Sequence, residues 1–149
     1  MNIDSIKNGF VLDHIKPEKG MEIYRFLGLD EVDGTVALIK NASSGRMGRK
    51  DIIKVDAKDL DIDLSILGYI DPEMTINVIE NEKLVKKYHP ELPEKIVDIV
   101  KCKNPRCITS TEQELKHIFK LTDRETRTYR CVYCETASPS GALRFAHTN

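Results

Sequence analysis

An α+β fold is what this sequence predicts: a βαββαβ domain followed by a small antiparallel β domain. Three observations lead to this prediction. The hydrophobic pattern alternates between strand-like and helix-like periods over residues 1–100, and all four cysteines lie between positions 102 and 134. The charge is also divided, because residues 1–101 sum to −4 and residues 102–149 to +3, which gives the net −1 of the chain. We therefore expect two domains, with a boundary shortly before the first cysteine.

The first half of the N-terminal domain is predicted as strand, helix, strand. Gly9–Ile15 is rich in branched and aromatic residues, which favours a strand. Pro17 suits the first turn of a helix, apolar residues follow at helical spacing, and Gly28 suits the helix end. Thr35–Lys40 predicts the second strand, and the Gly/Ser-rich stretch 41–48 predicts a loop.

The second half adds strand, helix, strand. Residues 50–55 predict a third strand that forms a hairpin with the second, and residues 60–70, which begin with acidic side chains, suit a short helix. Residues 74–79 alternate and predict the fourth strand, which Lys83–Lys86 is expected to extend at a sheet edge. The order βαββαβ is that of a ferredoxin-like split βαβ sandwich.

Prolines mark the boundary between the domains. His89–Pro93 contains two of them and predicts a linker, so we expect the domains at 1–93 and 94–149. Ile96, Val97 and Val100 are expected to form a short apolar joint after this linker.

Residues 108–130 allow two interpretations. A helix is possible because Thr111–Glu114 has the form of a capping box, and antiparallel strands are possible because apolar residues also alternate after it. We favour strands, because a compact ribbon brings two cysteine pairs together with few residues.

The four cysteines predict a metal site. Four residues separate Cys102 from Cys107, two separate Cys131 from Cys134, and 23 lie between the pairs. Tetrahedral Zn²⁺ takes four thiolates at about 2.3 Å, and close pairs on two tight turns supply them. Two disulfides or four unrelated thiols are the alternatives. The first ten residues lack the apolar segment of a secretory signal, which favours a reducing, cytoplasmic setting and reduced thiols. We expect one structural zinc per chain, because four protein ligands leave no position for a reacting water.

Several classes of function are disfavoured. No apolar run approaches the length of about 20 residues that crosses a membrane. The nearly balanced charge disfavours a protein that mainly coats nucleic acid. Walker, G-x-S-x-G, H-E-x-x-H and dinucleotide-binding motifs are missing from the sequence, and its four histidines are not spaced as metal ligands. We therefore expect no enzyme activity, no nucleic-acid partner and no membrane partner.

Polar residues on the predicted sheet indicate an anionic ligand. Lys50 and Lys54 lie four apart on one strand and so share a face. Asp13, His14 and Asn77 lie on strands that should be neighbours, and Lys86–Lys87 follows the last of them. Ammonium groups suit phosphates, whereas Asp13 and Asn77 suit a sugar or a base. A solvated sheet with ordinary surface lysines is the alternative.

Several segments together resemble the regulatory chain of aspartate carbamoyltransferase. They are Val11–Ile15, Ser44–Lys54, Thr75–Asn77, Leu92–Glu94 and the frame Cys102-x4-Cys107-Ile-Thr…Cys131-x-Tyr-Cys134-Glu135. The resemblance runs in order from about residue 3 to residue 135, and the stretch Met47–Lys54 joined to this cysteine frame is highly specific.

The resemblance implies a regulatory subunit without catalytic activity. It implies an N-terminal domain that binds nucleoside triphosphates, and a zinc domain that contacts the catalytic chain. Two regulatory chains are expected to pair through their N-terminal domains, and these dimers join catalytic trimers. CTP, often aided by UTP, would inhibit the first committed step of pyrimidine synthesis, and ATP would oppose this. The nucleotide contacts that the resemblance implies are Ile3, Asp4, Ser5, Ile6, Val11, Asp13, His14, Lys50, Lys54, Asn77, Ile79, Leu84 and Lys87.

Two positions depart from the family pattern. Glu82 stands where an aromatic residue often touches the base, so we expect either an altered choice of nucleotide or weaker binding. Arg106 replaces a common Asn between the first two cysteines, which is expected to change contacts with the catalytic chain.

Two other classes of function are kept as alternatives. The first is a zinc-ribbon module that binds nucleic acid, which Arg124, Arg127 and Arg130 favour and a shortage of stacking aromatics opposes. The second is a zinc enzyme, which four thiolate ligands disfavour.

Overall fold

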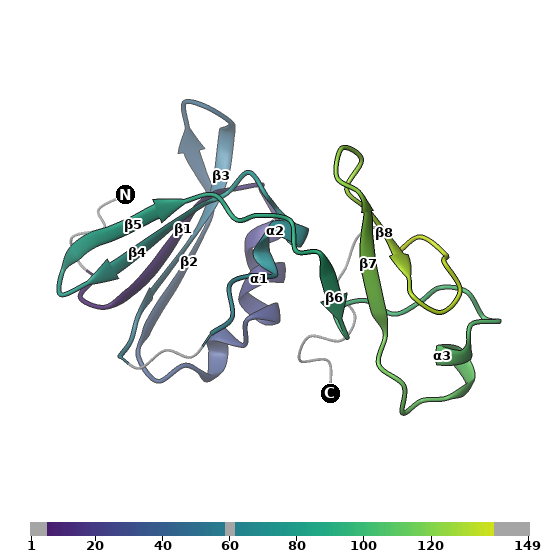
Figure 1. Ribbon diagram of the computed structural model, residues 1–149. Helices are drawn as coiled ribbons and strands as arrows, with labels where there is room; N and C mark the ends of the chain where they lie inside the picture. The colour runs from purple at the N-terminus through teal and green to yellow at the C-terminus, as the bar shows by residue number, and fades with distance from the viewer. Residues whose placement is uncertain (1–5, 59–61, 139–149) are drawn as a thin grey trace. The chain divides into compact units, whose positions relative to one another are not determined.

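In the computed structural model, which describes residues 6–58 and 62–138, five antiparallel strands form the first sheet in the order β2-β3-β1-β4-β5 (Figure 1). The chain divides into two units, residues 1–91 and 92–149. The elements of the first unit are β1 (Gly9–Ile15), α1 (Lys19–Phe26), the 3-10 turn η2 (Leu29–Glu31), β2 (Thr35–Ser44), β3 (Gly48–Asp56), α2 (Leu67–Ile70), β4 (Thr75–Glu80) and β5 (Lys83–Tyr88).

The order of these strands confirms the ferredoxin-like prediction. β3 lies between β1 and β2 and is antiparallel to both, so β1-α1-β2 is a split βαβ unit. The same holds for β3-α2-β4, with β1 between the two strands. β5 is added at the β4 edge.

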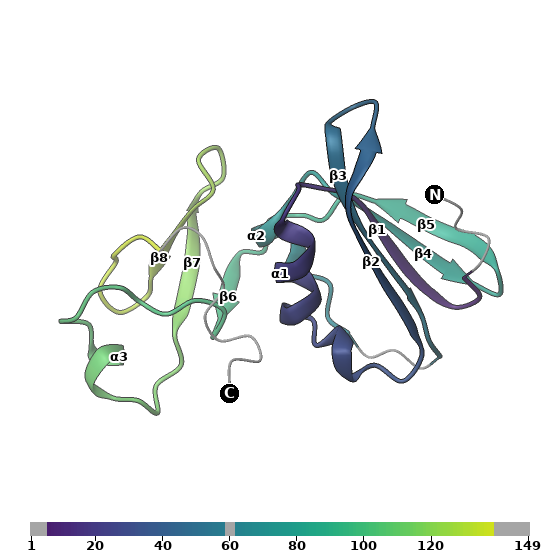
Figure 2. The same cartoon turned by 180° about the vertical axis from the view of Figure 1, so that it is seen from behind.

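Both helices cover one face of the sheet, which we call the helix face (Figure 2). Alternate residues of the strands project there and pack against α1, η2 and α2, and all of these side chains are buried. They are Phe10, Leu12, Ile53, Val55 and Ile76 from the strands, with Ile23, Leu29 and Leu67 from the helical elements. This core fixes which residues are left for the opposite face.

The segment 41–48 was predicted as a loop, and this is wrong. β2 continues to Ser44 and β3 begins at Gly48, so the turn is confined to residues 45–47. Asn41 has a φ of +56°, and the β2–β3 register shifts between Ile39 and Ala42. A β-bulge therefore carries the strand through polar residues that are typical of a loop.

The second helix is shorter than the predicted range of residues 60–70. α2 is Leu67–Ile70, and residues 60 and 61 of the predicted range lie outside the described residues. The Asp63 carboxylate accepts the Ser65 N–H at 2.9 Å, a local turn that competes with helix formation.

Lys83–Tyr88 is a separate strand and does not extend β4. Asn81 and Glu82 both have positive φ, +51° and +68°, which is the backbone of a tight hairpin turn. The chain therefore reverses, and β5 pairs with β4.

The second unit has its own sheet of three antiparallel strands in the order β6-β7-β8. Its elements are β6 (Lys95–Val97), α3 (Ile108–Thr111), β7 (Ile118–Asp123) and β8 (Thr128–Cys131). The strand interpretation of residues 108–130 is confirmed for β7 and β8. The capping box at Thr111 is not used, because α3 ends at that residue.

Residues 94–100, predicted as a short apolar joint, contain strand β6 of the second sheet. Ile96 lies opposite Phe119 in the second sheet, and both side chains are buried with Val100. The segment is therefore a strand and core of the second unit. Among the described residues, no helix has the length and apolar composition needed to cross a membrane.

Candidate functional site

The four cysteines of the second unit come together as a tetrahedral set. Their Sγ atoms all lie within 4.8 Å of one another. Cys102 and Cys134 are 3.6 Å apart, and Cys107 and Cys131 are 3.7 Å apart. Four thiolates at 2.3 Å from one Zn²⁺ would be separated by roughly 3.8 Å. The geometry thus fits a single structural zinc. Each of the two short Sγ–Sγ distances joins a cysteine of the first knuckle to a cysteine of the second.

Neighbouring polar groups hold the thiolates in place. The Thr109 hydroxyl donates to Cys107 Sγ at 3.1 Å, and the Thr136 hydroxyl lies 3.2 Å from Cys134 Sγ. The backbone N–H of Cys102 donates to Nδ1 of His117, which is buried. His117 was not singled out from the sequence, because its partner is a backbone group that no spacing rule reveals.

Protonation of the thiols opposes metal binding. Burial raises the pKa of the Cys102 thiol to about 12 and raises the pKa of Cys131 as well. At Cys134 burial also acts to raise the pKa, but hydrogen bonds from Thr136 outweigh it and the pKa falls to about 6. Because Zn²⁺ binds thiolates, it must displace the remaining protons, and its affinity decreases as the pH falls.

A second candidate site lies on the sheet face opposite the helices, which we call the lysine face. Four residues lie directly opposite one another across four strands: Lys54 of β3, Val11 of β1, Asn77 of β4 and Lys87 of β5. Direct cross-strand partners share a face, so these side chains form one row. Asn77 is buried, and its side-chain N–H donates to the Val11 carbonyl at 3.2 Å.

Asp13 and Lys50 form an ion pair on the same face. Their side chains meet at 3.0 Å and both are half-buried. Burial acts to raise the pKa of Asp13, but the hydrogen bonds from Lys50 and from the His14 N–H, the latter 2.7 Å long, outweigh it and hold the pKa below its usual value. Asp13 is therefore a carboxylate at neutral pH.

His14 lies among several cations. Burial and the charges of Lys50, Arg46 and Lys87 lower its pKa, and Asp13 only partly opposes them. Its Nδ1 lies 3.3 Å from the Thr75 hydroxyl. Arg46 was missed at the sequence level, because it stands in a stretch interpreted as an ordinary loop. The positive potential around His14 makes this part of the lysine face suitable for an anion.

The structure places the described members of the sequence-predicted nucleotide set on this face or beside it. Ile6, Val11 and Ile79 pack together with Ile52 in a small apolar cluster, and Leu84 lies opposite Ile79. Ile3, Asp4 and Ser5 lie outside the described residues. The residues that were named for anion binding and those that form the apolar cluster thus share one surface.

The two positions that depart from the family pattern lie in turns. Glu82 is in the β4–β5 turn, where its N–H donates to the Lys7 carbonyl at 2.9 Å. Arg106 is in the first cysteine knuckle, and its N–H donates to the Asn104 side chain at 3.0 Å.

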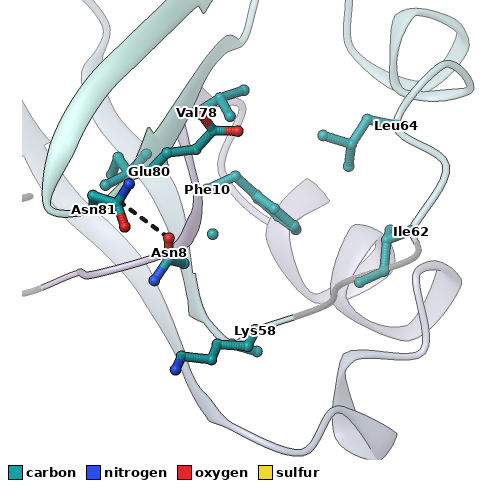
Figure 3. Close-up of a pocket in the computed structure, with 11 residues that line it drawn as sticks. Asn8, Phe10, Lys58, Ile62, Leu64, Val78, Glu80 and Asn81 are labelled. Atoms are coloured by element: carbon teal, nitrogen blue, oxygen red, sulfur yellow. Dashed lines mark hydrogen bonds between the residues drawn. The ribbon is translucent and has the colours of Figure 1, made fainter.

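One cavity lined by described residues lies away from these two sites. It has a volume of about 530 Å³ and opens at the ends of β1 and β4 (Figure 3). Phe10, Ile62, Leu64 and Val78 form its apolar part. Phe10 and Val78 lie opposite each other and point to the helix face, so this cavity is distinct from the lysine row. No motif in the sequence indicated this cavity.

Both units match models of one protein family. Residues 1–91 match the model described as aspartate carbamoyltransferase regulatory chain, allosteric domain, and residues 94–140 match the model described as the metal binding domain of that chain. The aspartate carbamoyltransferase regulatory chain of Clostridium tetani is 50% identical over 135 residues, which cover 91% of this chain and 94% of the relative. The protein of the same name from Clostridium botulinum strain Hall is 50% identical over 143 residues, 96% and 97% of the two chains. That from Bifidobacterium longum is 42% identical over 135 residues, 91% and 96%.

We predict that Cys107→Ser removes the zinc and unfolds the second unit while the first unit stays folded. The metal supplies folding free energy to a unit whose apolar core is small, so the loss of one ligand has a large effect. Elemental analysis and thermal melting measure this. Ser110→Ala, at an exposed position of α3 just after this knuckle, is the control and should keep both. A Cys107→Ser chain with one zinc and unchanged melting of the second unit would contradict the prediction.

Proposed function

We propose that this chain, which belongs to the family of aspartate carbamoyltransferase regulatory chains, binds nucleoside triphosphates on its lysine face and contacts a catalytic chain through its zinc unit. It has no catalytic role of its own and acts in pyrimidine synthesis in the cytoplasm. The observation that carries the proposal is the cross-strand row from Lys54 to Lys87, which joins two ammonium groups and a buried amide on one surface.

Charge and hydrogen bonding support a nucleotide as the ligand. Lys50, Lys54 and Lys87 offer three cations on one face, and ammonium–phosphate hydrogen bonds are among the stronger polar contacts in proteins. Asp13 offers a carboxylate acceptor and Asn77 offers a side-chain amide. These groups suit hydrogen bonds to a sugar hydroxyl or to a base. A triphosphate would compete with Asp13 for Lys50, so binding exchanges one ion pair for another.

Exposed apolar side chains support the contact with a catalytic chain. Ile108 follows the ligand Cys107, and Val132 and Tyr133 lie between the other two ligands. Each of the three is more than two-fifths exposed, which is unusual for large apolar residues grouped at one site. We propose that the zinc holds both knuckles so that these side chains meet the partner.

Pairing of two regulatory chains through their N-terminal domains is part of the proposal. β2 and β5 are the edge strands of the first sheet, and Val85 on β5 is 52% exposed. Edge strands present unpaired backbone groups and are natural sites of association.

The nucleic-acid alternative is not favoured. Phe119 and Tyr129, two of the four aromatic residues in 102–149, are buried in the core and are not available for stacking on bases. Arg130 donates to the Glu135 carbonyl at 3.1 Å, and Arg124 lies 3.9 Å from the Glu94 carboxylate, so these two cations have partners within the unit.

We predict that Lys87→Gln weakens CTP binding about fivefold, because it removes one exposed charge-assisted contact worth about 1 kcal/mol. Lys86→Gln is the matched control. Lys86 lies opposite Val78 and stands over the Tyr88 ring at 4.4 Å, so it points to the other face and its loss should leave the affinity unchanged. Calorimetry on the two variants measures this. Equal CTP affinities of the two variants would show that Lys87 does not bind the nucleotide.

We predict that CTP binds more tightly at pH 6 than at pH 8. In the free protein, burial and neighbouring cations keep the pKa of His14 below its usual value. A triphosphate adds negative charge and raises that pKa, so binding takes up a proton and is favoured as the pH falls through the His14 titration. Calorimetric titrations of wild type and His14→Gln test this. Protonation of the nucleotide itself affects both proteins equally, so the difference between them reports on His14. The same pH dependence in both proteins would contradict the prediction.

We predict that Tyr133→Ala weakens the complex with the catalytic chain by about tenfold or more, as expected for a large aromatic side chain at an interface. Tyr133→Phe, which keeps the ring, should assemble nearly as well as the wild type. Sedimentation of mixtures with the catalytic chain measures assembly, and zinc content shows whether the knuckle is intact. Undiminished assembly of a zinc-loaded Tyr133→Ala chain would place the contact elsewhere.

A further inference from the structure

One buried carboxylate, that of Asp51, has no part in the sites described so far. Asp51 is 0% exposed and lies between Lys50 and Ile52 on β3, with its side chain on the helix face. Its Oδ2 accepts the N–H of Glu18 at 2.9 Å and the N–H of Gly20 at 3.1 Å. Its Oδ1 accepts the N–H of Asn41 at 3.0 Å. A single side chain thus joins the start of α1 to β2 and β3.

These hydrogen bonds lie at two irregularities of the sheet. The register of β1 shifts between Leu12 and Ile15, and that of β2 shifts between Ile39 and Ala42. Both shifts fall beside the same part of β3, because Ile15 lies opposite Asp51 and Ala42 lies opposite Lys50.

The backbone at these irregularities is in a costly conformation. Asn41 has a φ of +56°, His14 of +59° and Glu18 of +77°. Residues with a side chain pay about 1 kcal/mol or more for this region, and they keep it only where the surroundings hold them. Asp51 bonds two of the three directly, and it closes the short connection from His14 to Glu18.

The opposite face of the same strands carries the Asp13–Lys50 ion pair. Lys50 precedes Asp51, and Asp13 accepts the N–H of His14, whose left-handed backbone forms part of the β1 irregularity. The direction in which Asp13 and Lys50 point therefore depends on this backbone. The Asp51 carboxylate holds that backbone by hydrogen bonds on the helix face.

We propose that Asp51 is a positioning residue of the lysine face: from the helix face, it fixes the two bulged segments that aim Asp13 and Lys50 at each other and at the ligand. The ligand in this statement rests on the proposed function, whereas the ion pair exists without any ligand. Because Glu18 and Gly20 lie at the start of α1, the same bonds tie that helix to the site.

Asp51→Asn tests the proposal. An amide has one oxygen and one NH₂ group, so in either orientation the NH₂ faces a backbone N–H that the carboxylate had accepted. Asp56→Asn is the control: it makes the same change on the same strand, far along β3 from the bulges, and among the described residues its carboxylate accepts only the Asn8 N–H, at 3.3 Å.

The first readout needs no nucleotide. Titration of the Asp13 carboxyl by NMR in the full chain should give a pKa below the usual value in the wild type and in Asp56→Asn, and a higher one in Asp51→Asn. A merely structural role would lower the melting temperature of Asp51→Asn without moving this titration. A folded Asp51→Asn chain with the wild-type Asp13 pKa would overturn the proposal.

The second readout is CTP affinity, which should fall about tenfold in Asp51→Asn and stay within twofold in Asp56→Asn. A wild-type chain that binds no CTP would refute the proposed function, and the Asp13 titration would still decide the role of Asp51.

Gly20→Ala covers the case in which Asp51→Asn does not fold. A Cβ at Gly20 would lie 2.8 Å from both Cβ and Oδ2 of Asp51, so it displaces the carboxylate without removing it. A Cβ at Gly45 meets nothing within 4 Å, which makes Gly45→Ala the control. Gly20→Ala should raise the Asp13 pKa and Gly45→Ala should not; equal values in the two variants would overturn the proposal.

Discussion

The register of β1 against its two neighbours determines where each functional side chain of the first unit lies. β1 is the middle strand, and its alternation sends Phe10 and Leu12 into the core beneath the helices and Val11 and Asp13 to the lysine face. A slip of one residue would exchange these sets and bury a carboxylate. The packing of α1 and α2 and the alignment of Lys54 with Asn77 and Lys87 are therefore consequences of the same pairing. The Asp51 carboxylate adds local precision, because it holds the irregular backbone on both sides of β3.

The second unit depends on a different constraint. Its apolar core consists of a few residues, among them Ile96, Val100, Phe119 and Tyr129, and the four cysteines complete it. Zinc then replaces the hydrophobic burial that a domain of this size lacks. The same coordination fixes the two knuckles, so the exposed Ile108 and Tyr133 are presented on a rigid support. If this unit contacts the catalytic chain as we propose, metal binding and partner binding are properties of one structure.

The sequence predicted those features that depend on short-range pattern. The cysteine spacing led to the zinc ligands, the branched and aromatic composition led to β1, and the period-two alternation led to β4, because these signals are local. It did not predict the continuation of β2 past Asn41, since a bulge allows residues typical of a loop to remain in a strand. It also missed β5 as a strand of its own, because Glu82 adopts a left-handed conformation that its residue type does not favour. The roles of Asp51 and His117 could not be predicted for another reason: their hydrogen-bond partners are backbone groups that are distant in sequence.

We propose that a nucleotide on the lysine face regulates a catalytic chain held by the zinc unit. The most direct measurement is the carbamoyltransferase activity of the catalytic chain, alone and reconstituted with this chain, during titrations with CTP and with ATP. We expect nucleotide to change the activity only in the reconstituted complex, and we expect displacement of zinc by a mercurial to remove the response as the complex dissociates. A complex that forms, contains zinc, and shows the same activity at every concentration of either nucleotide would contradict it.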